Sequence, residues 1–231
     1  MALLPDPSAY PLCGFFLTGY LTKKDDPVNF RPNDVPGVFQ RHERVFEDAL
    51  QVLGITKEAL RKRPEFNFDS GDVSSLESAS AILRVVVCLH RNGFTHIALI
   101  KAGPTTGADI TCEKNGAKLC CEVKAITKQS KGRDDFFLED QLYEKIRENI
   151  AKARNQLKTT ARALQCKLTM FISVMNWEIH TMVLGDSDFQ NVVEKLERED
   201  HELDGIDIVL LITGAGLQHF FISEGGKCIN C

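Results

Sequence analysis

Two acidic residues and a lysine lie on either side of a predicted tight turn, and their spacing could support metal-assisted chemistry. Asn115-Gly116 is a strong signal for a two-residue β-hairpin turn, because both residue types tolerate the positive φ angles that such turns require. With that turn, the hairpin register sets Asp109 directly opposite Glu122. Lys124 follows Glu122 by two residues and therefore shares its face of the sheet. We expect the three side chains to converge on one spot.

This convergence has an electrostatic cost that a metal ion would remove. Directly opposed residues have Cβ atoms about 4.5–5.5 Å apart, and two carboxylates so close repel each other. A hard cation, Mg²⁺ or Mn²⁺, suits the oxygens of Asp109 and Glu122. The ammonium of Lys124 could then orient an attacking water or stabilise charge on a phosphorus. The alternative is a solvated hairpin face, on which Lys124 neutralises Glu122 and Glu113 pairs with Lys118.

The composition is ordinary for a soluble globular protein. The 231 residues are 43% hydrophobic and 26% charged, which excludes a mainly disordered, collagen-like or coiled-coil chain. No apolar run approaches the roughly 20 residues that cross a bilayer, and the N-terminal segment is a poor signal peptide. We therefore expect a cytoplasmic protein without a membrane partner, whose eight cysteines are thiols. Cys228 and Cys231 have zinc spacing, but one pair cannot complete a tetrahedral site.

The charge is unevenly distributed along the chain. Residues 114–167 hold 13 Lys and Arg against 7 Asp and Glu, whereas the rest of the chain holds 15 against 25. A basic middle in a protein of net charge −4 indicates an anionic partner for that segment.

The pattern of apolar residues and breakers predicts a mixed α/β sheet flanked by helices. Seven of the eight prolines lie in the first 64 residues, which predicts an irregular arm over 1–38. We expect a mainly helical or irregular N-terminal extension at 1–69 and the main domain at 70–231. Predicted helices cover about 40–53, 74–91, 138–164 and 187–199, and predicted strands cover 96–101, the two hairpin runs, 168–174, 206–213 and 217–223. On the hairpin, the residues expected on the core face are Ala108, Ile110, Cys112, Leu119, Cys121, Val123 and Ala125.

Asp109 and Glu122-Val123-Lys124, each within an apolar strand, resemble the motif of the PD-(D/E)XK nuclease superfamily. Gly107-Ala108-Asp109-Ile110 departs from the Pro-Asp of that name. The likeness is greatest to the Holliday-junction resolvase and Mrr-type restriction endonuclease branches. Their element order is helix, strand, strand with Asp, strand with Glu-x-Lys, helix and strand, and about 100 residues from Ser74 to Val174 are expected to follow it.

The resemblance implies a restriction-endonuclease-like fold and roles for individual residues. Asp109, Glu122 and the carbonyl of Val123 would bind the metal, and Lys124 would position the nucleophilic water. Glu77 lies where the superfamily often has a further acidic ligand. The alternative for Glu77 is a capping box with Ser74, which would only stabilise the start of a helix.

The helix after the Glu-x-Lys strand carries the basic residues that would bind phosphates. They are Lys145, Arg147, Lys152, Arg154, Lys158 and Arg162 on the helix, with Lys128, Lys131 and Arg133 in the loop before it. The resemblance also implies a glutamine on this helix that contacts water or metal, and Gln156 is the candidate. The alternative is a solvated helix face stabilised by i,i+4 ion pairs.

The sequence therefore predicts a Mg²⁺-dependent endonuclease that hydrolyses phosphodiester bonds, with DNA as the first expected substrate and RNA as the second. Two strands need two active sites, so a homodimer is one expectation. The first alternative is a catalytically silent nuclease-fold protein that binds nucleic acid or a protein partner. The second alternative is a different metal-dependent phosphohydrolase.

Overall fold

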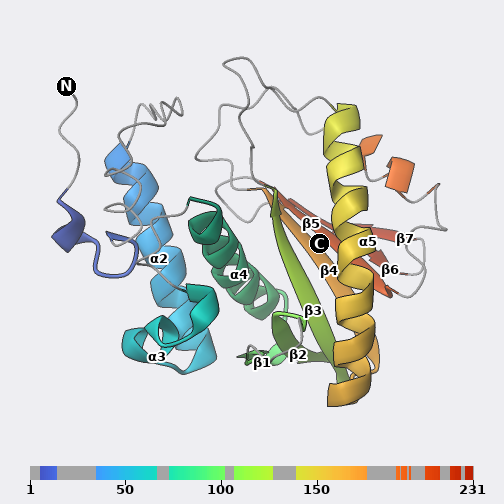
Figure 1. Cartoon of the computed structure of the whole chain (residues 1–231), viewed down its shortest axis with the longest axis horizontal. Coiled ribbons are helices and arrows are strands. Elements are labelled where there is room, and N and C mark those ends of the chain that lie inside the picture. The colour runs from blue at the N-terminus through green and yellow to red at the C-terminus, as the bar shows by residue number, and fades with distance from the viewer. Residues whose placement is uncertain are drawn as a thin grey trace.

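The architecture is a seven-stranded mixed β-sheet with helices on both faces, seen in a computed structural model (Figure 1). The predicted α/β class and the flanking of the sheet by helices are confirmed. Within the described part of the chain, no helix is both long and apolar enough to cross a membrane. The structure describes residues 6–14, 35–66, 73–101, 107–126, 139–175, 191–192, 194–196, 198, 206–213, 219–224 and 227–230.

The strands lie in the sheet in the order of the chain, from β1 to β7. The central strands β3, β4 and β5 are parallel to one another, and every other neighbouring pair is antiparallel. Parallel neighbours need crossover connections, which is why a long helix follows β3. The strands are β1 Thr95–Leu99, β2 Ile110–Lys114, β3 Ala117–Ile126, β4 Leu168–Met175, β5 Ile208–Thr213, β6 His219–Glu224 and β7 Lys227–Asn230.

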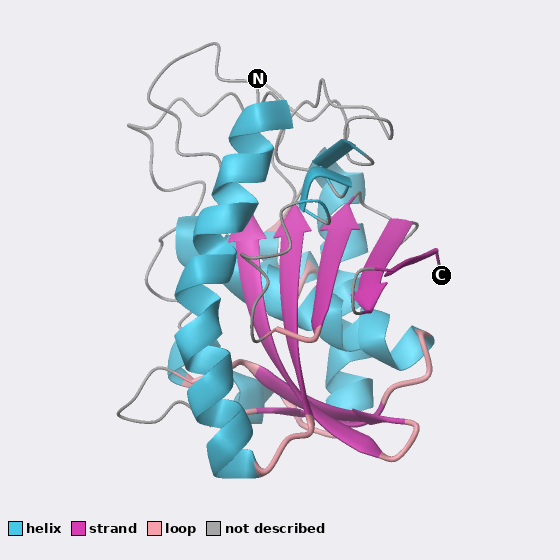
Figure 2. Cartoon of the chain, turned by 90° about the vertical axis from the view of Figure 1, so that its right-hand side faces the viewer, coloured by secondary structure: helices cyan, strands magenta, loops and turns pink. Residues whose placement is uncertain are grey.

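The helices form layers on either side of this sheet. Helix α4 covers one face and α5 covers the other, while α2 packs on the outer side of α4 (Figure 1). Figure 2 shows α5 running along the length of the strands. The helices are α2 Val35–Leu53, α3 Lys57–Arg61, α4 Val73–Arg91 and α5 Glu139–Leu164, with short 3₁₀ helices η1 Pro7–Ala9 and η2 Pro64–Phe66.

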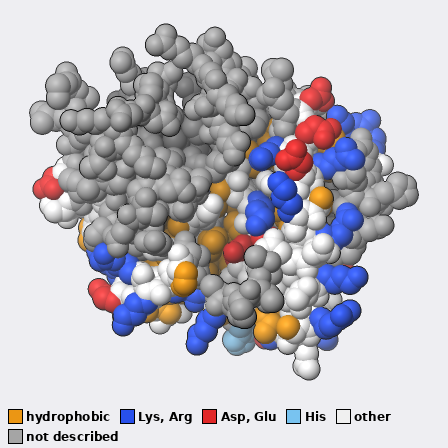
Figure 3. All heavy atoms as spheres, viewed as in Figure 1, with side chains coloured by type: hydrophobic (Ala, Val, Ile, Leu, Met, Phe, Trp, Pro, Cys, Tyr) orange, Lys and Arg blue, Asp and Glu red, His pale blue; other side chains and the backbone are white. Residues whose placement is uncertain are grey.

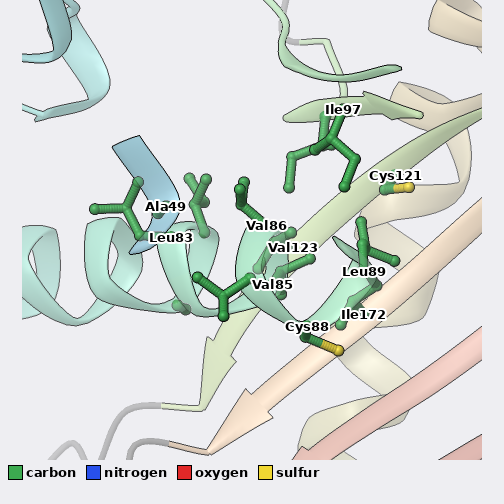
Figure 4. Close-up of a cluster of buried hydrophobic side chains, with 14 of the residues drawn as sticks. Ala49, Leu83, Val85, Val86, Cys88, Leu89, Ile97, Cys121, Val123 and Ile172 are labelled. Carbon is green, nitrogen blue, oxygen red and sulfur yellow. The ribbon is translucent and has the colours of Figure 1, made fainter. Parts of the chain in front are cut away.

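An apolar core lies between α4 and the sheet. Val85 and Leu89 of α4 are buried there against Val123 of β3 and Ile172 of β4 (Figure 4). The odd-numbered residues of β3 from Leu119 to Val123 belong to this core. Burial of one such side chain contributes roughly 1.5–3 kcal/mol to the stability of the fold. The burial of several of them determines which residues of β3 face α4.

A second core lies between α5 and the opposite face of the sheet. It joins Ile146, Ile150 and Leu157 of α5 to Cys120 of β3 and Phe171 of β4. Because side chains alternate along a strand, Glu122 and Lys124 point to this α5 side, together with Cys120. The site described below therefore lies between the sheet and α5.

Helix α4 ends as the sequence predicts. Gly93 has φ of +76°, and its N–H donates to the carbonyl of His90 at 3.1 Å. The N–H of Phe94 donates to the carbonyl of Leu89 at 3.0 Å, which completes a Schellman cap. This cap turns the chain from α4 into β1.

The N-terminal part differs from the predicted irregular arm. Helix α2 begins at Val35, earlier than the predicted start near 40. Leu12 and Cys13 are buried, and their N–H groups each donate a 2.7 Å hydrogen bond to the carboxylate of Glu43 on α2. A buried carboxylate with two N–H donors fixes this segment to α2, which prolines alone could not indicate.

The predicted boundary between 69 and 70 stays a prediction, and one apolar core spans it. Phe46 and Ala49 of α2 are buried in the same cluster as Leu83 of α4. The N-terminal extension therefore packs on the sheet domain through α4.

The six cysteines whose side chains the structure describes form no disulfide with one another. Cys88 and Cys112 are buried core residues, as predicted, whereas Cys166 is half-buried. Burial raises the pKa of the Cys120 thiol to about 12, which keeps it protonated.

The last third of the chain follows the predicted order, with one addition. The described residues between 191 and 198 are helical, within the predicted helix 187–199. Strands β5 and β6 match the two predicted strands. Strand β7 was not predicted; it contains Cys228, while Cys231 lies outside the described residues.

Candidate active site

Strands β2 and β3 form the predicted hairpin, and its register is the predicted one from the pair Lys114–Ala117 to the pair Ile110–Cys121. Asn115 and Gly116 have φ angles of +52° and +74°, the left-handed values that a type I′ turn requires. Ile110 pairs with Cys121 at the other end of the ladder. The two acidic residues of the motif come next on each strand, so the hairpin delivers them to the same end of the ladder.

The ladder becomes irregular at Asp109. The N–H of Asp109 donates to the carbonyl of Cys121 at 2.9 Å, although Cys121 is already the partner of Ile110. Two residues facing one is the arrangement of a β-bulge, which breaks the alternation of side chains. Ala108 is accordingly buried on the α5 side and Ile110 on the α4 side. The prediction that Ala108 shares the core face of Ile110 is therefore wrong, and Asp109 faces Cys121 rather than lying directly opposite Glu122 as predicted.

The backbone around Asp109 is held on three sides. The N–H of Val123 donates to Oδ2 of Asp109 at 2.8 Å, and the N–H of Ile100 donates to its carbonyl at 2.8 Å. The N–H of Ala108 donates to Oγ1 of Thr160 on α5 at 2.9 Å. Because the N–H and C=O of one strand residue face the same edge, the Val123 carbonyl also faces the edge where Asp109 lies.

Glu122 is a buried carboxylate beside Asp109. The residue is 1% exposed, and Lys124 Nζ donates to its Oε1. Its Oε2 is buried without a hydrogen-bond partner in the described part of the chain. Burial and the negative charge of Asp109 raise the pKa of Glu122 to about 7, against the opposing effect of the Lys124 ammonium. The three predicted residues therefore gather at one site, and Oε2 of Glu122 is an acceptor there that no described residue uses.

A residue that sequence reasoning missed lies beside them. Ser173 of β4 is paired in register with Lys124 of β3 and is fully buried. Paired residues of parallel strands project to the same face, so the Ser173 hydroxyl is on the α5 side with Glu122. Its Oγ is also buried without a hydrogen-bond partner among the described residues. The signal in the sequence was one polar residue in the apolar run Met170–Val174.

Helix α5 covers this face, and only one of its flanks lies toward Asp109. Thr160 marks that flank through its bond with Ala108. At about 100° per residue, Gln156 and the buried Asn149 lie within roughly 40° of Thr160 around the helix axis. Gln156, the candidate from the sequence, is half-buried on this flank.

The basic residues of α5 divide between two flanks. Lys145 and Lys152 lie within roughly 80° of Thr160, whereas Arg154 and Lys158 lie about 120–160° away. Arg147 falls on the distant flank as well. Figure 3 shows Lys and Arg side chains gathered over α5 on one side of the molecule.

Some of these charges also have partners on the helix. Glu148 lies 3.8 Å from Lys145 and 3.9 Å from Lys152, and Glu144 lies 3.7 Å from Arg147. Such exposed pairs contribute about 0–1 kcal/mol, so they break easily when a phosphate competes.

The remaining predicted residues fall partly outside the described part. Lys128, Lys131 and Arg133 lie outside the described residues. Glu77 lies within α4, which begins at Val73, and its side chain is outside the described part.

The metal-binding potential of the site lies in a pair of carboxylates rather than in a larger cluster. No group of three or more His, Cys, Asp and Glu side chains gathers within the described residues. Asp109 and Glu122 with a backbone carbonyl are an all-oxygen set, which suits Mg²⁺ or Mn²⁺ and not zinc. Comparison with protein-family models, curated proteins and solved structures finds no match to this chain.

Proposed function

We propose that this protein is a metal-dependent nuclease with a restriction-endonuclease-like core, and that it hydrolyses phosphodiester bonds in DNA. The observation that carries the proposal is the gathering of Asp109, Glu122 and Lys124 at one end of the hairpin. The element order α4, β1, β2, β3, α5, β4 supports it, because the resembling superfamily has this order.

The residues present fit a hard divalent cation. Within the described residues, Glu122 keeps one buried oxygen without a partner, and burial and the charge of Asp109 raise its pKa, a cost that a bound cation would offset. Asp109, Glu122 and the Val123 carbonyl would hold the ion, with Glu77 as the candidate for a further ligand. When bound, Mg²⁺ would lower the pKa of a water and offset the charge on the phosphate.

The protein supplies positioning and charge. The Lys124 ammonium, which now donates to Glu122, would orient the attacking water in line with the leaving oxygen. Lys145 and Lys152 on the near flank of α5 would hold phosphates beside the carboxylates. Gln156 would contact water at the same place. We extend the proposal to a cytoplasmic protein that acts as a homodimer, since cutting two strands takes two sites.

Cleavage of plasmid and branched DNA by the full chain, with Mg²⁺ or with EDTA, tests the proposal. Asp109→Asn and Lys124→Met should each reduce the rate by at least about 100-fold, as removal of one transition-state contact does in other enzymes. Glu113→Gln is the matched control, because Glu113 is an acidic residue of the same hairpin whose side chain is 41% exposed and pairs with His96.

Two other outcomes would replace the proposal with its alternatives. Wild-type protein that binds DNA but does not cut it in Mg²⁺ or Mn²⁺ would be a catalytically silent nuclease fold. Hydrolysis of nucleotides without cleavage of polymers would indicate a different phosphohydrolase.

A further inference from the structure

Strand β4 carries two buried hydroxyl groups with contrasting surroundings. Thr169 Oγ1 donates to Asp207 Oδ2 at 2.8 Å and accepts from the Asp207 N–H at 3.2 Å. Ser173 is more deeply buried, with an exposed fraction of 0% against 7% for Thr169, but its Oγ has no hydrogen-bond partner within the described residues. Thr169 therefore stabilises the fold, whereas Ser173 leaves a polar atom unsatisfied in the same strand.

The unsatisfied hydroxyl lies next to the candidate active site. Ser173 is the register partner of Lys124, and the two residues project to the same side of parallel neighbours. Phe171, the register partner of Glu122, is apolar, and its side chain has no hydrogen-bond donor for that carboxylate. Two buried oxygens that have no partner in the described part of the chain, Ser173 Oγ and Glu122 Oε2, thus occur on the same face of two adjacent strands.

Lys124 is the group that both oxygens could share. Its ammonium has three N–H donors and now donates one of them to Glu122 Oε1. If both oxygens of Glu122 are drawn toward a cation, the ammonium is repelled by that cation and needs another acceptor. The acceptor on the neighbouring strand is Ser173 Oγ.

We propose that Ser173 is a positioning residue for Lys124: its hydroxyl accepts a hydrogen bond from the Lys124 ammonium when a divalent cation engages Glu122. This inference rests on the proposed function. The exchange frees Glu122 for the cation and holds Lys124 within the site, where it can orient the water. A hydroxyl that serves the metal-bound state is unsatisfied in the metal-free state, which explains why this buried serine has no partner among the described residues.

The experiment compares Ser173→Ala and Ser173→Thr with wild type in the full chain. The alanine variant lacks the hydroxyl, whereas the threonine variant keeps a hydroxyl at the same position. Ser80→Ala is the matched control, because Ser80 is a buried serine on α4, 2% exposed, whose Oγ lies 3.3 Å from Nδ1 of His42 on α2. The readouts are the melting temperature in EDTA, Mn²⁺ affinity by calorimetry, and kcat and KM for DNA cleavage.

Ser173→Ala is expected to affect stability and metal binding in opposite directions. Ser173→Ala should melt at the same or a higher temperature than wild type in EDTA, because it removes an unsatisfied polar atom. The same variant should bind Mn²⁺ about tenfold more weakly and lose kcat by a similar factor, as variants of outer-shell partners do. KM should change by no more than about twofold. Ser173→Thr should restore most of the Mn²⁺ affinity and of kcat.

A crystal structure with Mn²⁺ gives a direct geometric check. Lys124 Nζ should lie within about 3.2 Å of Ser173 Oγ, with Mn²⁺ about 2.0–2.5 Å from oxygens of Asp109 and Glu122. Lys124 still bonded to Glu122 in that structure would overturn the inference.

The failures of the two proposals are distinguishable. If wild type cuts DNA but Ser173→Ala keeps its Mn²⁺ affinity and kcat, the role of Ser173 is refuted and the nuclease proposal stands. If Ser173→Ala melts at a lower temperature and binds Mn²⁺ normally, Ser173 is structural. If wild type binds no Mn²⁺ at all, both proposals fall.

Discussion

Thr160 Oγ1 on α5 accepts a hydrogen bond of 2.9 Å from the N–H of Ala108, the residue that precedes Asp109. A side chain of the helix thereby holds the irregular start of β2. Thr160 is 6% exposed, so the bond is shielded from water. The position of one acidic residue of the site is consequently tied to the helix that carries the basic residues.

We predict that Thr160→Val loosens Asp109. The buried Ala108 N–H would lose its acceptor, at a cost of about 1–3 kcal/mol in the free energy of unfolding. Mn²⁺ affinity should fall by about tenfold, because a second-sphere contact is lost. Calorimetric titration measures this, with Thr160→Ser as the control that keeps the acceptor. Equal affinities of wild type and Thr160→Val would show that Asp109 needs no anchor on α5.

Glu122 should make the metal-free protein less stable as the pH rises. Its pKa is about 7 in the folded protein, whereas the ordinary value of 4.5 applies to the unfolded chain. Between these values the unfolded chain has released the proton while the folded protein retains it, so the free energy of unfolding falls with rising pH. The full effect is roughly 3 kcal/mol, and it is complete above about pH 7.

Urea denaturation in EDTA at several pH values between 4.5 and 8 measures this effect. Glu122→Gln has no titrating group at the position and should show a flatter profile than wild type. Parallel profiles for the two proteins would contradict the raised pKa. Saturating Mg²⁺ at neutral pH should stabilise wild type more than Glu122→Gln, since ligand binding stabilises the state that binds it.

The two flanks of α5 should contribute unequally to DNA binding. Lys152 lies on the flank of Thr160, and Lys158 lies on the distant one. Lys152→Gln should reduce the slope of log affinity against log salt by about one phosphate contact. Lys158→Gln changes the charge equally and should leave the slope nearly unchanged. Fluorescence anisotropy across a salt series measures both, and equal reductions would place DNA across both flanks.

Glu43 should be the most sensitive residue of the N-terminal part. Its buried carboxylate accepts from the N–H groups of Leu12 and Cys13, each at 2.7 Å. Glu43→Ala should cost about 3 kcal/mol of unfolding free energy, because hydrogen bonds to a charged group are lost and two buried donors remain. Glu47→Ala, an exposed neighbour on α2, should cost less than about 0.5 kcal/mol. Urea denaturation separates the two, and similar losses would refute the anchoring role.

Local sequence patterns were sufficient for the hairpin that forms the site. The turn at Asn115-Gly116 determines the register, and the register alone brings Glu122 to the end of β2. Periodicity was equally sufficient for α5, because its core residues recur every three or four positions over many turns. Both features depend on neighbours in the chain.

The features that were not predicted depend on contacts distant in sequence. The face of Ala108 changes at a β-bulge, which no alternation pattern announces. Leu12 meets Glu43 across 31 residues, and only the packing of α2 brings them together. The place of Ser173 beside Lys124 depends on the pairing of β3 with β4, whose residues are about 50 positions apart in the chain.

The spatial order of the strands in the sheet is the order in which they are synthesised. Each new strand can therefore pair with an edge that already exists, and the sheet can grow in one direction during synthesis. The hairpin with Asp109 and Glu122 emerges before α5 and before β4. The burial of Glu122 in the finished fold therefore depends on segments that are synthesised after it.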